Sequence, residues 1–182
     1  MLVELEVNMS NSKTKKIFFI SECLLNQNIR AYGVGNMKGS GSVADIVDLL
    51  KINDIGFSVV PCPEIPYEGL KRFACGKSHY NNEKYRAICS DLAGQFIERY
   101  KLYIDDNYKI GGFICVNGSP SCACDYCYDG EDGHTKCMEP GVFVEEIQKK
   151  LKKENLSLNF IGVRIKELDS VLEKIKNSIS KL

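Results

Sequence analysis

Four short apolar runs separate longer amphipathic segments along the chain, and this alternation constrains the fold more than any other feature. The runs predict strands at Lys16 to Ser21, Gly56 to Val60, Gly111 to Val116 and Leu158 to Val163. Between and after them, apolar side chains recur at helical spacing. Strands that alternate with helices favour a parallel sheet with helices packed on its faces. We therefore expect an α/β, Rossmann-like, three-layer fold with a parallel sheet of about four strands and helices on both faces.

The helical spacing is clearest in three stripes of apolar residues. These are Val43, Ile46, Val47 and Leu50; Tyr85, Ile88, Cys89, Leu92, Phe96 and Tyr100; and Leu168, Val171, Leu172, Ile175 and Ile179. Ser40 or Ser42 can cap the first of these helices. A fourth helix is predicted up to about Lys152, with Pro140 in its first turn.

The length of the chain suits one domain with a sizeable core. The sequence has 182 residues, and we expect residues 1–182 to form a single domain. Residues 1–15 are predicted to be a loose arm or a small edge strand. The connection from Pro61 to Asn82 contains prolines and glycines in a pattern typical of an ordered functional loop.

Charge and hydropathy exclude some classes of protein. Lys plus Arg equals Asp plus Glu, at 24 each, so a basic surplus for nucleic acid is missing. No apolar run approaches the roughly 20 residues of a membrane span, and no signal peptide is evident. We therefore expect a cytoplasmic protein without a nucleic-acid or membrane partner. Its nine cysteines are an odd number and indicate metal or redox chemistry rather than a disulfide framework.

Three of these cysteines follow predicted strands. Cys23, Cys62 and Cys122 come shortly after the first, second and third apolar runs. Loops at the carboxyl edge of a parallel sheet converge, and ligands bind there. A single buried cysteine is usually a packing residue, but three at consecutive strand ends indicate a metal site. Three protein ligands, rather than four, leave one coordination position for substrate.

The residues around these cysteines resemble those of a known family. Ser21-Glu22-Cys23-Leu24-Leu25, Cys62-Pro63-Glu64 with Gly69-Leu70 after it, and Ser119-Pro120-Ser121-Cys122 are similar to the signature blocks of the thiouracil desulfurase (TudS) family. Within that family the chain resembles the branch of TudS-related desulfidases. The resemblance spans roughly Lys16 to Cys122.

This resemblance implies a cofactor, a reaction and roles for particular residues. It implies an oxygen-sensitive 4Fe-4S cluster bound by Cys23, Cys62 and Cys122, with a fourth iron open to the substrate's sulfur. It also implies a catalytic carboxylate, Glu64, and a catalytic serine, Ser119 in preference to Ser121. The expected reaction is non-redox removal of sulfur, as sulfide, from a thionated small molecule such as a nucleobase.

The chain departs from the family pattern in three places. Asn26 stands where the family usually has Gly. Ile29-Arg30-Ala31-Tyr32-Gly33 echoes the family's Val-Arg-Tyr-Asp-Gly block without its aspartate. These two departures leave the substrate open among thionated nucleobases, small metabolites and other thioamides. The third is a surplus of cysteine, because Cys124 or Cys127 could be an extra ligand that caps the fourth iron.

Other interpretations of the cysteine-rich loop remain open at this point. Cys122, Cys124, Cys127 and Cys137, with His134 nearby, could form a structural zinc site. Cys124 and Cys127 could instead be a dithiol switch. A zinc site or a fully ligated cluster would make the protein a structural, sensing or electron-transfer protein. We expect packing roles for the remaining cysteines, Cys75, Cys89 and Cys115.

Overall fold

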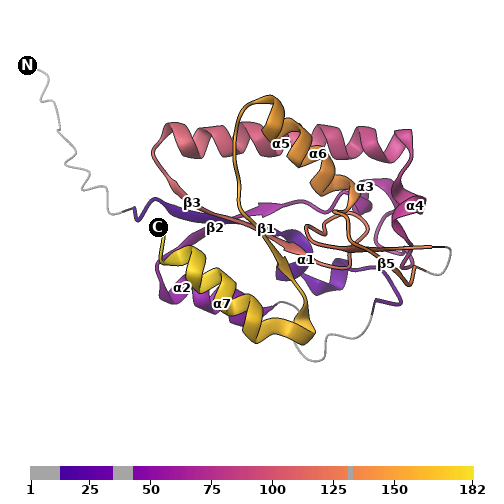
Figure 1. Ribbon diagram of the computed structural model, residues 1–182, viewed down its shortest axis with the longest axis horizontal. Helices are drawn as coiled ribbons and strands as arrows, with labels where there is room; N and C mark the ends of the chain where they lie inside the picture. The colour runs from indigo at the N-terminus through magenta and orange to yellow at the C-terminus, as the bar shows by residue number, and fades with distance from the viewer. Residues whose placement is uncertain (1–12, 35–42, 131–132) are drawn as a thin grey trace, which may run out of the picture.

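The computed structural model describes residues 13–34, 43–130 and 133–182 of the chain (Figure 1). The predicted arm or edge strand at residues 1–15 falls almost wholly outside these ranges, as do the two proposed capping residues, Ser40 and Ser42. No helix within the described ranges is both long and apolar enough to cross a membrane.

The core of the fold is a four-stranded parallel sheet, as the alternation predicts. Its strands are β1 (Lys16–Ser21), β2 (Gly56–Val60), β3 (Lys109–Val116) and β6 (Phe160–Val163), in the order β2-β1-β3-β6. The first two strands have the predicted bounds. The other two differ by two residues at their starts, because polar Lys109 pairs with Lys16 and Leu158 lies outside the ladder. All four carboxyl ends therefore lie at one edge.

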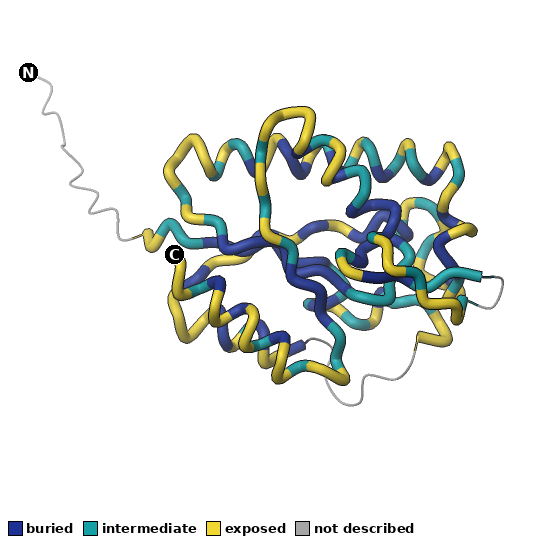
Figure 2. Tube along the Cα trace, viewed as in Figure 1, coloured by how far each residue is buried: buried dark blue, intermediate teal, exposed yellow. Residues whose placement is uncertain are grey.

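Helices cover both faces of this sheet (Figure 1), which gives the expected three layers. Helices α5 (Glu83–Asp105) and α6 (Val142–Lys153) lie on one face, and α2 (Ala44–Ile52) and α7 (Leu168–Ile179) lie on the other. Figure 2 shows the buried strands between them. Successive side chains of β1 point to opposite faces of the sheet, so the core has two parts. Phe19 packs with α5 and α6, whereas Phe18 and Ile20 pack with α2 and α7.

Helix α5 follows its predicted apolar stripe. Tyr85, Cys89, Phe96 and Tyr100 are buried, and Phe96 packs on Phe19 with 4.7 Å between ring centroids. The helix begins where Asn82 accepts a hydrogen bond from the Tyr85 amide through its side chain. The apolar stripe was predicted from the sequence, whereas the Asn82 cap is seen only in the structure.

Helix α6 begins two residues later than predicted, and the reason matters for the site. Pro140 lies outside the helix, and Gly141 is its cap. The first amides of a helix have no partners within it. Here the amides of Val142, Phe143 and Val144 donate to the carbonyls of Pro120 and Ser121. The loop after β3 is thus held against the start of α6, which the local sequence did not indicate.

Short elements interrupt the two long connections. The segment between β2 and α5 contains α3 (Glu64–Glu68) and α4 (Lys77–Tyr80), which confirms that it is ordered. The segment after β3, predicted to be a loop, contains an antiparallel pair, β4 (Cys127–Asp129) and β5 (Thr135–Cys137). Helix α1 (Glu22–Leu25) and the 3-10 helices η1 (Gln27–Ile29) and η2 (Ile165–Glu167) follow β1 and β6.

Candidate active site

A cavity of about 710 Å³ lies at the carboxyl edge of the sheet. Its walls come from the segments that follow β1, β2, β3 and β6, with further contributions from β4 and from the segment between α3 and α4. All five residues predicted for the site line it: Cys23, Cys62, Glu64, Ser119 and Cys122. The parallel topology therefore brings these residues together from three distant parts of the chain.

The three thiols are buried or half-buried and influence one another. Burial raises the pKa of Cys23 to about 11. Burial also raises the pKa values of Cys62 and Cys122, and Cys23 contributes to the increase in both. None of the three is in a disulfide. Desolvation therefore favours the neutral thiol form of all three residues.

Backbone contacts fix two of these cysteines. The Cys62 amide donates to Glu22 Oε2 at 2.9 Å, which ties the loop after β2 to the helix that carries Cys23. The Cys122 amide donates to Ser119 Oγ at 3.0 Å, and the Ser121 amide donates to the same oxygen at 3.2 Å. Ser119 thus closes the turn that presents Cys122 to the cavity.

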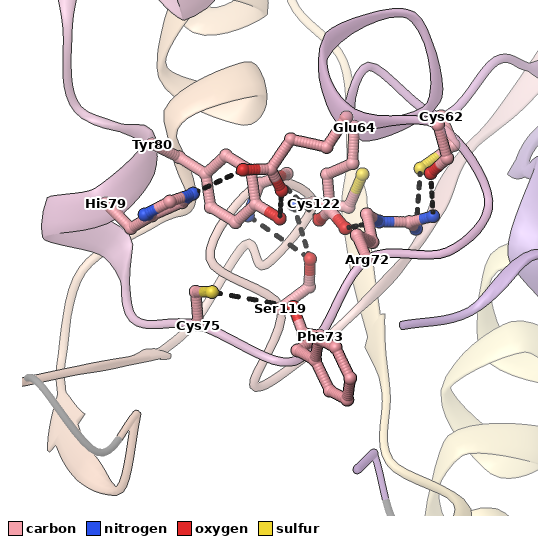
Figure 3. A network of polar contacts seen from close by, with 12 residues as sticks. Cys62, Glu64, Arg72, Phe73, Cys75, His79, Tyr80, Ser119 and Cys122 are labelled. Atoms are coloured by element: carbon pink, nitrogen blue, oxygen red, sulfur yellow. Dashed lines mark hydrogen bonds and ion pairs between the residues drawn. The ribbon is translucent and has the colours of Figure 1, made fainter. Parts of the chain in front are cut away.

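Glu64 is buried and has a partner for each carboxylate oxygen. Arg72 Nε lies 2.7 Å from Oε2, and Ser121 Oγ donates to Oε1 at 2.7 Å. The Arg72 guanidinium also donates to Cys62 Sγ at 3.6 Å, a contact marked by a dashed line in Figure 3. A buried carboxylate needs such partners. The ion pair therefore fixes Glu64 beside the thiol of Cys62.

Two buried hydroxyl groups form a hydrogen-bonded chain that ends at Glu64. Tyr85 OH lies 2.6 Å from Ser121 Oγ, and both groups are buried. A serine hydroxyl has one proton. Since Ser121 donates that proton to Glu64, Tyr85 must donate to Ser121. Burial raises the pKa of Tyr85, which keeps the phenol protonated for this role.

The two serines of the loop therefore have different positions. Ser119, the serine favoured from the sequence, faces the cavity and holds Cys122. Ser121 is fully buried and contacts Glu64 instead. A two-residue spacing in an irregular loop does not reveal which hydroxyl points where, so this division required the structure.

Sequence reasoning missed Arg72 and the hydroxyl of Tyr85. Arg72 is buried although it lies in a polar loop with no periodic pattern. Tyr85 belongs to the apolar stripe of α5, which gives no indication of a polar contact. The available signal was indirect: a glutamate expected beside buried thiols implies a cation and a hydrogen-bond donor somewhere in the chain.

The chain is similar to known proteins in sequence and in fold. No family model matches the chain. The uncharacterized protein MJ0003 of Methanocaldococcus jannaschii is 30% identical over 157 residues, which cover 86% of this chain and 91% of that protein. The chain belongs to the family of MJ0003. A solved structure, that of the 4Fe-4S-dependent thiouracil desulfidase TudS, is 14% identical and covers 89% of this chain and 99% of its own, with a TM-score of 0.49. Likeness at that level transfers no function.

In this member of the MJ0003 family, the surplus cysteines lie away from the cavity walls. Cys124 Sγ lies 3.8 Å from Asn117 Oδ1. Cys127 is aligned with Cys137 in the register of β4 and β5. Neither Cys124 nor Cys127 lines the described cavity. Cys89 and Cys115 are buried in the core, as predicted, whereas Cys75 both packs on the core and lines the cavity.

A single metal ion and a multi-iron cluster require different spacings of their thiolate ligands. Among the described residues, no three or more His, Cys, Asp or Glu side chains are grouped to hold a single metal ion. Ligands lie about 2.0–2.3 Å from a zinc ion, which crowds them together. A multi-iron cluster binds its thiolates through different irons and sets them farther apart. Of the residues considered for a zinc site, Cys122 and His134 line the cavity, whereas Cys124, Cys127 and Cys137 do not.

Proposed function

We propose that this protein is an iron–sulfur-dependent desulfidase that exchanges the sulfur of a thiocarbonyl small molecule for oxygen. The observation that carries the proposal is the placement of Glu64, held by Arg72 and Ser121, in the wall of a cavity that three strand-end cysteines also line. Water supplies the oxygen and sulfur leaves as sulfide, so the carbon keeps its oxidation level. No electron donor is needed.

Cys23, Cys62 and Cys122 would hold a 4Fe-4S cluster in this proposal. Thiolates are the ligands that such clusters prefer. When bound, the cluster would supply a Lewis acid for the soft sulfur of the substrate. The reducing cytoplasm, where we expect the protein to act, keeps these cysteines available as thiols.

Glu64 is the proposed general base. Arg72 and Ser121 each occupy one lone pair of its carboxylate and fix its orientation. Each oxygen retains a second lone pair, and Glu64 lines the cavity, so the carboxylate can accept a proton from a water molecule there. The buried pair with Arg72 keeps this group in one position before substrate binds.

Ser119 is the proposed hydrogen-bond donor to substrate. Its oxygen accepts hydrogen bonds from the amides of Ser121 and Cys122, which uses its acceptor capacity. Its own proton is then free to donate toward the cavity. Such a donor, held in place by two backbone amides, is suited to stabilising charge at a reacting group.

The test begins with the cofactor. Anaerobic reconstitution should give a brown protein with about four irons per chain. Incubation with a panel of thionated nucleobases and thioamides should then release sulfide without an added electron donor. A colourless protein with one tightly bound zinc would contradict the proposal, as would an iron-loaded protein inert on the whole panel.

The role of Glu64 is tested by a matched pair of variants. Glu64→Gln should keep its iron and lose about 100- to 10,000-fold in the rate of sulfide release, the usual effect of losing a general base. Glu68→Gln is the control, because Glu68 lies on the same short helix but contacts Tyr80 and His79. Turnover of Glu64→Gln at the parent rate would exclude the proposed role.

A further inference from the structure

Two cysteines that the proposed reaction does not use lie directly opposite each other. In the antiparallel pair of β4 and β5, the register aligns Cys127 with Cys137. Residues aligned in this way have Cα atoms about 4.5 or 5.5 Å apart. Both values fall within the range of about 4.4–6.8 Å that a disulfide requires. Both thiols are free in this structure.

The alternation of the strands puts both thiols on the same face of this ribbon. Their neighbours Tyr128 and Lys136 are aligned with each other and lie on the opposite face. On that face, Lys136 Nζ lies 4.0 Å from the centre of the Tyr126 ring, and Tyr128 lines the cavity. The cysteine face and the cavity face are therefore distinct.

The spacing of the cysteines in the sequence left a different pairing open. Cys124 and Cys127 have the spacing of a dithiol switch, but Cys124 faces Asn117 and contacts the thiol of Cys115. The groups that influence Cys127 are Lys77, Cys137, Glu139 and Asp129. The tertiary structure thus gives Cys127 a new thiol partner ten positions further along the chain.

We propose that Cys127 and Cys137 are a redox modification site, at which a small disulfide such as oxidised glutathione converts the two thiols to a cross-strand disulfide. This inference concerns residues outside the cavity wall and does not depend on the proposed reaction. The bond would cross-link β4, which carries Tyr128, to β5 at one end of the strand pair. Oxidation would then fix one wall of the cavity.

Burial of the two thiols sets the order of the steps. Cys137 is half-buried and Cys127 is fully buried, so the small disulfide reaches Cys137 first. The Cys137 thiolate attacks it, forms a mixed disulfide and releases one small thiol. The Cys127 thiolate then attacks Cys137 Sγ and releases the second small thiol. Two protons pass from the cysteines to the two departing thiolates, so atoms and electrons balance.

The charges beside Cys127 act on its thiol in opposite directions, because Lys77 favours the thiolate whereas Glu139 and Asp129 oppose it. Burial raises the pKa of the Cys127 thiol to about 11, whereas the ammonium of Lys77 acts in the opposite direction. Lys77 is held beside the ribbon by Glu139 at 2.8 Å and Glu145 at 2.6 Å. Asp129 anchors the other end of β4, because it accepts hydrogen bonds from the amide and hydroxyl of Ser78 on α4. The ribbon is thus in place before oxidation.

The test maps cross-links in protein prepared anaerobically and incubated with mixtures of reduced and oxidised glutathione. Free thiols are then alkylated, and peptides are identified by mass spectrometry. We expect a Cys127–Cys137 cross-link and the loss of two alkylatable thiols per chain. Oxidation should also raise the Tm, because the bond restricts the unfolded chain. The expected rise is about 5 °C, since the closed loop is short.

Two variants make the result specific. Cys124→Ser should form the same cross-link and show the same rise in Tm, whereas Cys137→Ser should show neither. If Cys137→Ser does not fold, the peptide map of the parent protein decides. A cross-link from Cys124 to Cys127 or to Cys115, glutathione retained on Cys137, or no reaction in oxidised glutathione would each overturn the proposal.

Discussion

Ser121 Oγ donates a 2.7 Å hydrogen bond to Glu64 Oε1 across 57 positions of sequence. The contact joins the loop after β3 to the start of α3, and it orients the carboxylate proposed as general base. The Ser121 hydroxyl in turn accepts a hydrogen bond from Tyr85 OH. One buried hydroxyl therefore links the cysteine loop to the carboxylate.

Replacing Ser121 should impair turnover more than cluster binding. Ser121→Ala leaves both a buried carboxylate oxygen and the Tyr85 phenol without their partner, which should cost about 1–3 kcal/mol of stability. Iron content should remain, because Ser119 still holds the Cys122 amide. We expect kcat to fall and KM to change little. Tyr85→Phe is the control, since it keeps the contact of Ser121 with Glu64, and its effect should be smaller. Equal kcat values for Ser121→Ala and the parent would show that the contact is only structural.

In a reconstitution assay, replacing a proposed ligand should reduce iron binding much more than replacing a surplus cysteine. Cys23→Ala, Cys62→Ala and Cys122→Ala should abolish or severely reduce iron and sulfide binding. Cys124→Ala, Cys127→Ala and Cys137→Ala should retain most of it, because Cys124 and Cys127 do not line the cavity and Cys137 is Cys127's partner. Iron counts on the six purified proteins decide this. Equal iron loss in Cys124→Ala and Cys62→Ala would refute a three-ligand site.

Gly141 should be essential to the site through packing alone. A Cβ at Gly141 would lie 2.4 Å from the backbone of Ser121, so Gly141→Ala must displace the loop that carries Ser121 and Cys122. We expect about 1–3 kcal/mol of destabilisation and a loss of bound iron. Gly111→Ala is a matched control, because its Cβ would meet the Phe18 ring at 2.0 Å in the core. It should lower the unfolding free energy while iron per folded chain stays at the parent value.

Stability should fall in acid through Glu145. Burial opposes ionisation of this residue, but hydrogen bonds from Lys77 and Arg86 outweigh it and lower its pKa below the ordinary 4.5. A carboxyl whose pKa is lower in the folded state stabilises the protein above its unfolded pKa. That contribution is lost as pH falls from 4.5 through the folded value.

Urea unfolding between pH 7 and pH 3 measures this effect. Glu145→Gln should reduce the difference in unfolding free energy across that range. Glu154→Gln should change it less, because the pair of Glu154 with Lys101 is exposed and screened by solvent. Identical pH profiles for Glu145→Gln and the parent would contradict the assignment.

The layers of the fold could be predicted because they depend on local patterns. The apolar run at Lys16–Ser21 and the stripe from Tyr85 to Tyr100 each report one element's own period. The placement of Cys23, Cys62 and Cys122 followed as well. Once the strands are parallel, their carboxyl ends must share an edge, and the cavity there contains all three residues.

The remaining features required the tertiary structure, since each depends on a partner distant in sequence. The start of α6 at Val142 is set by carbonyls of the loop after β3, not by Pro140. The choice of Ser121 as Glu64's partner, and of Arg72 as its counter-ion, depends on where irregular loops point. Cys127 has a close sequence neighbour in Cys124, yet the strand register aligns it with Cys137. Sequence periodicity determines which face of an element is buried, but only the packed chain decides which buried polar groups meet.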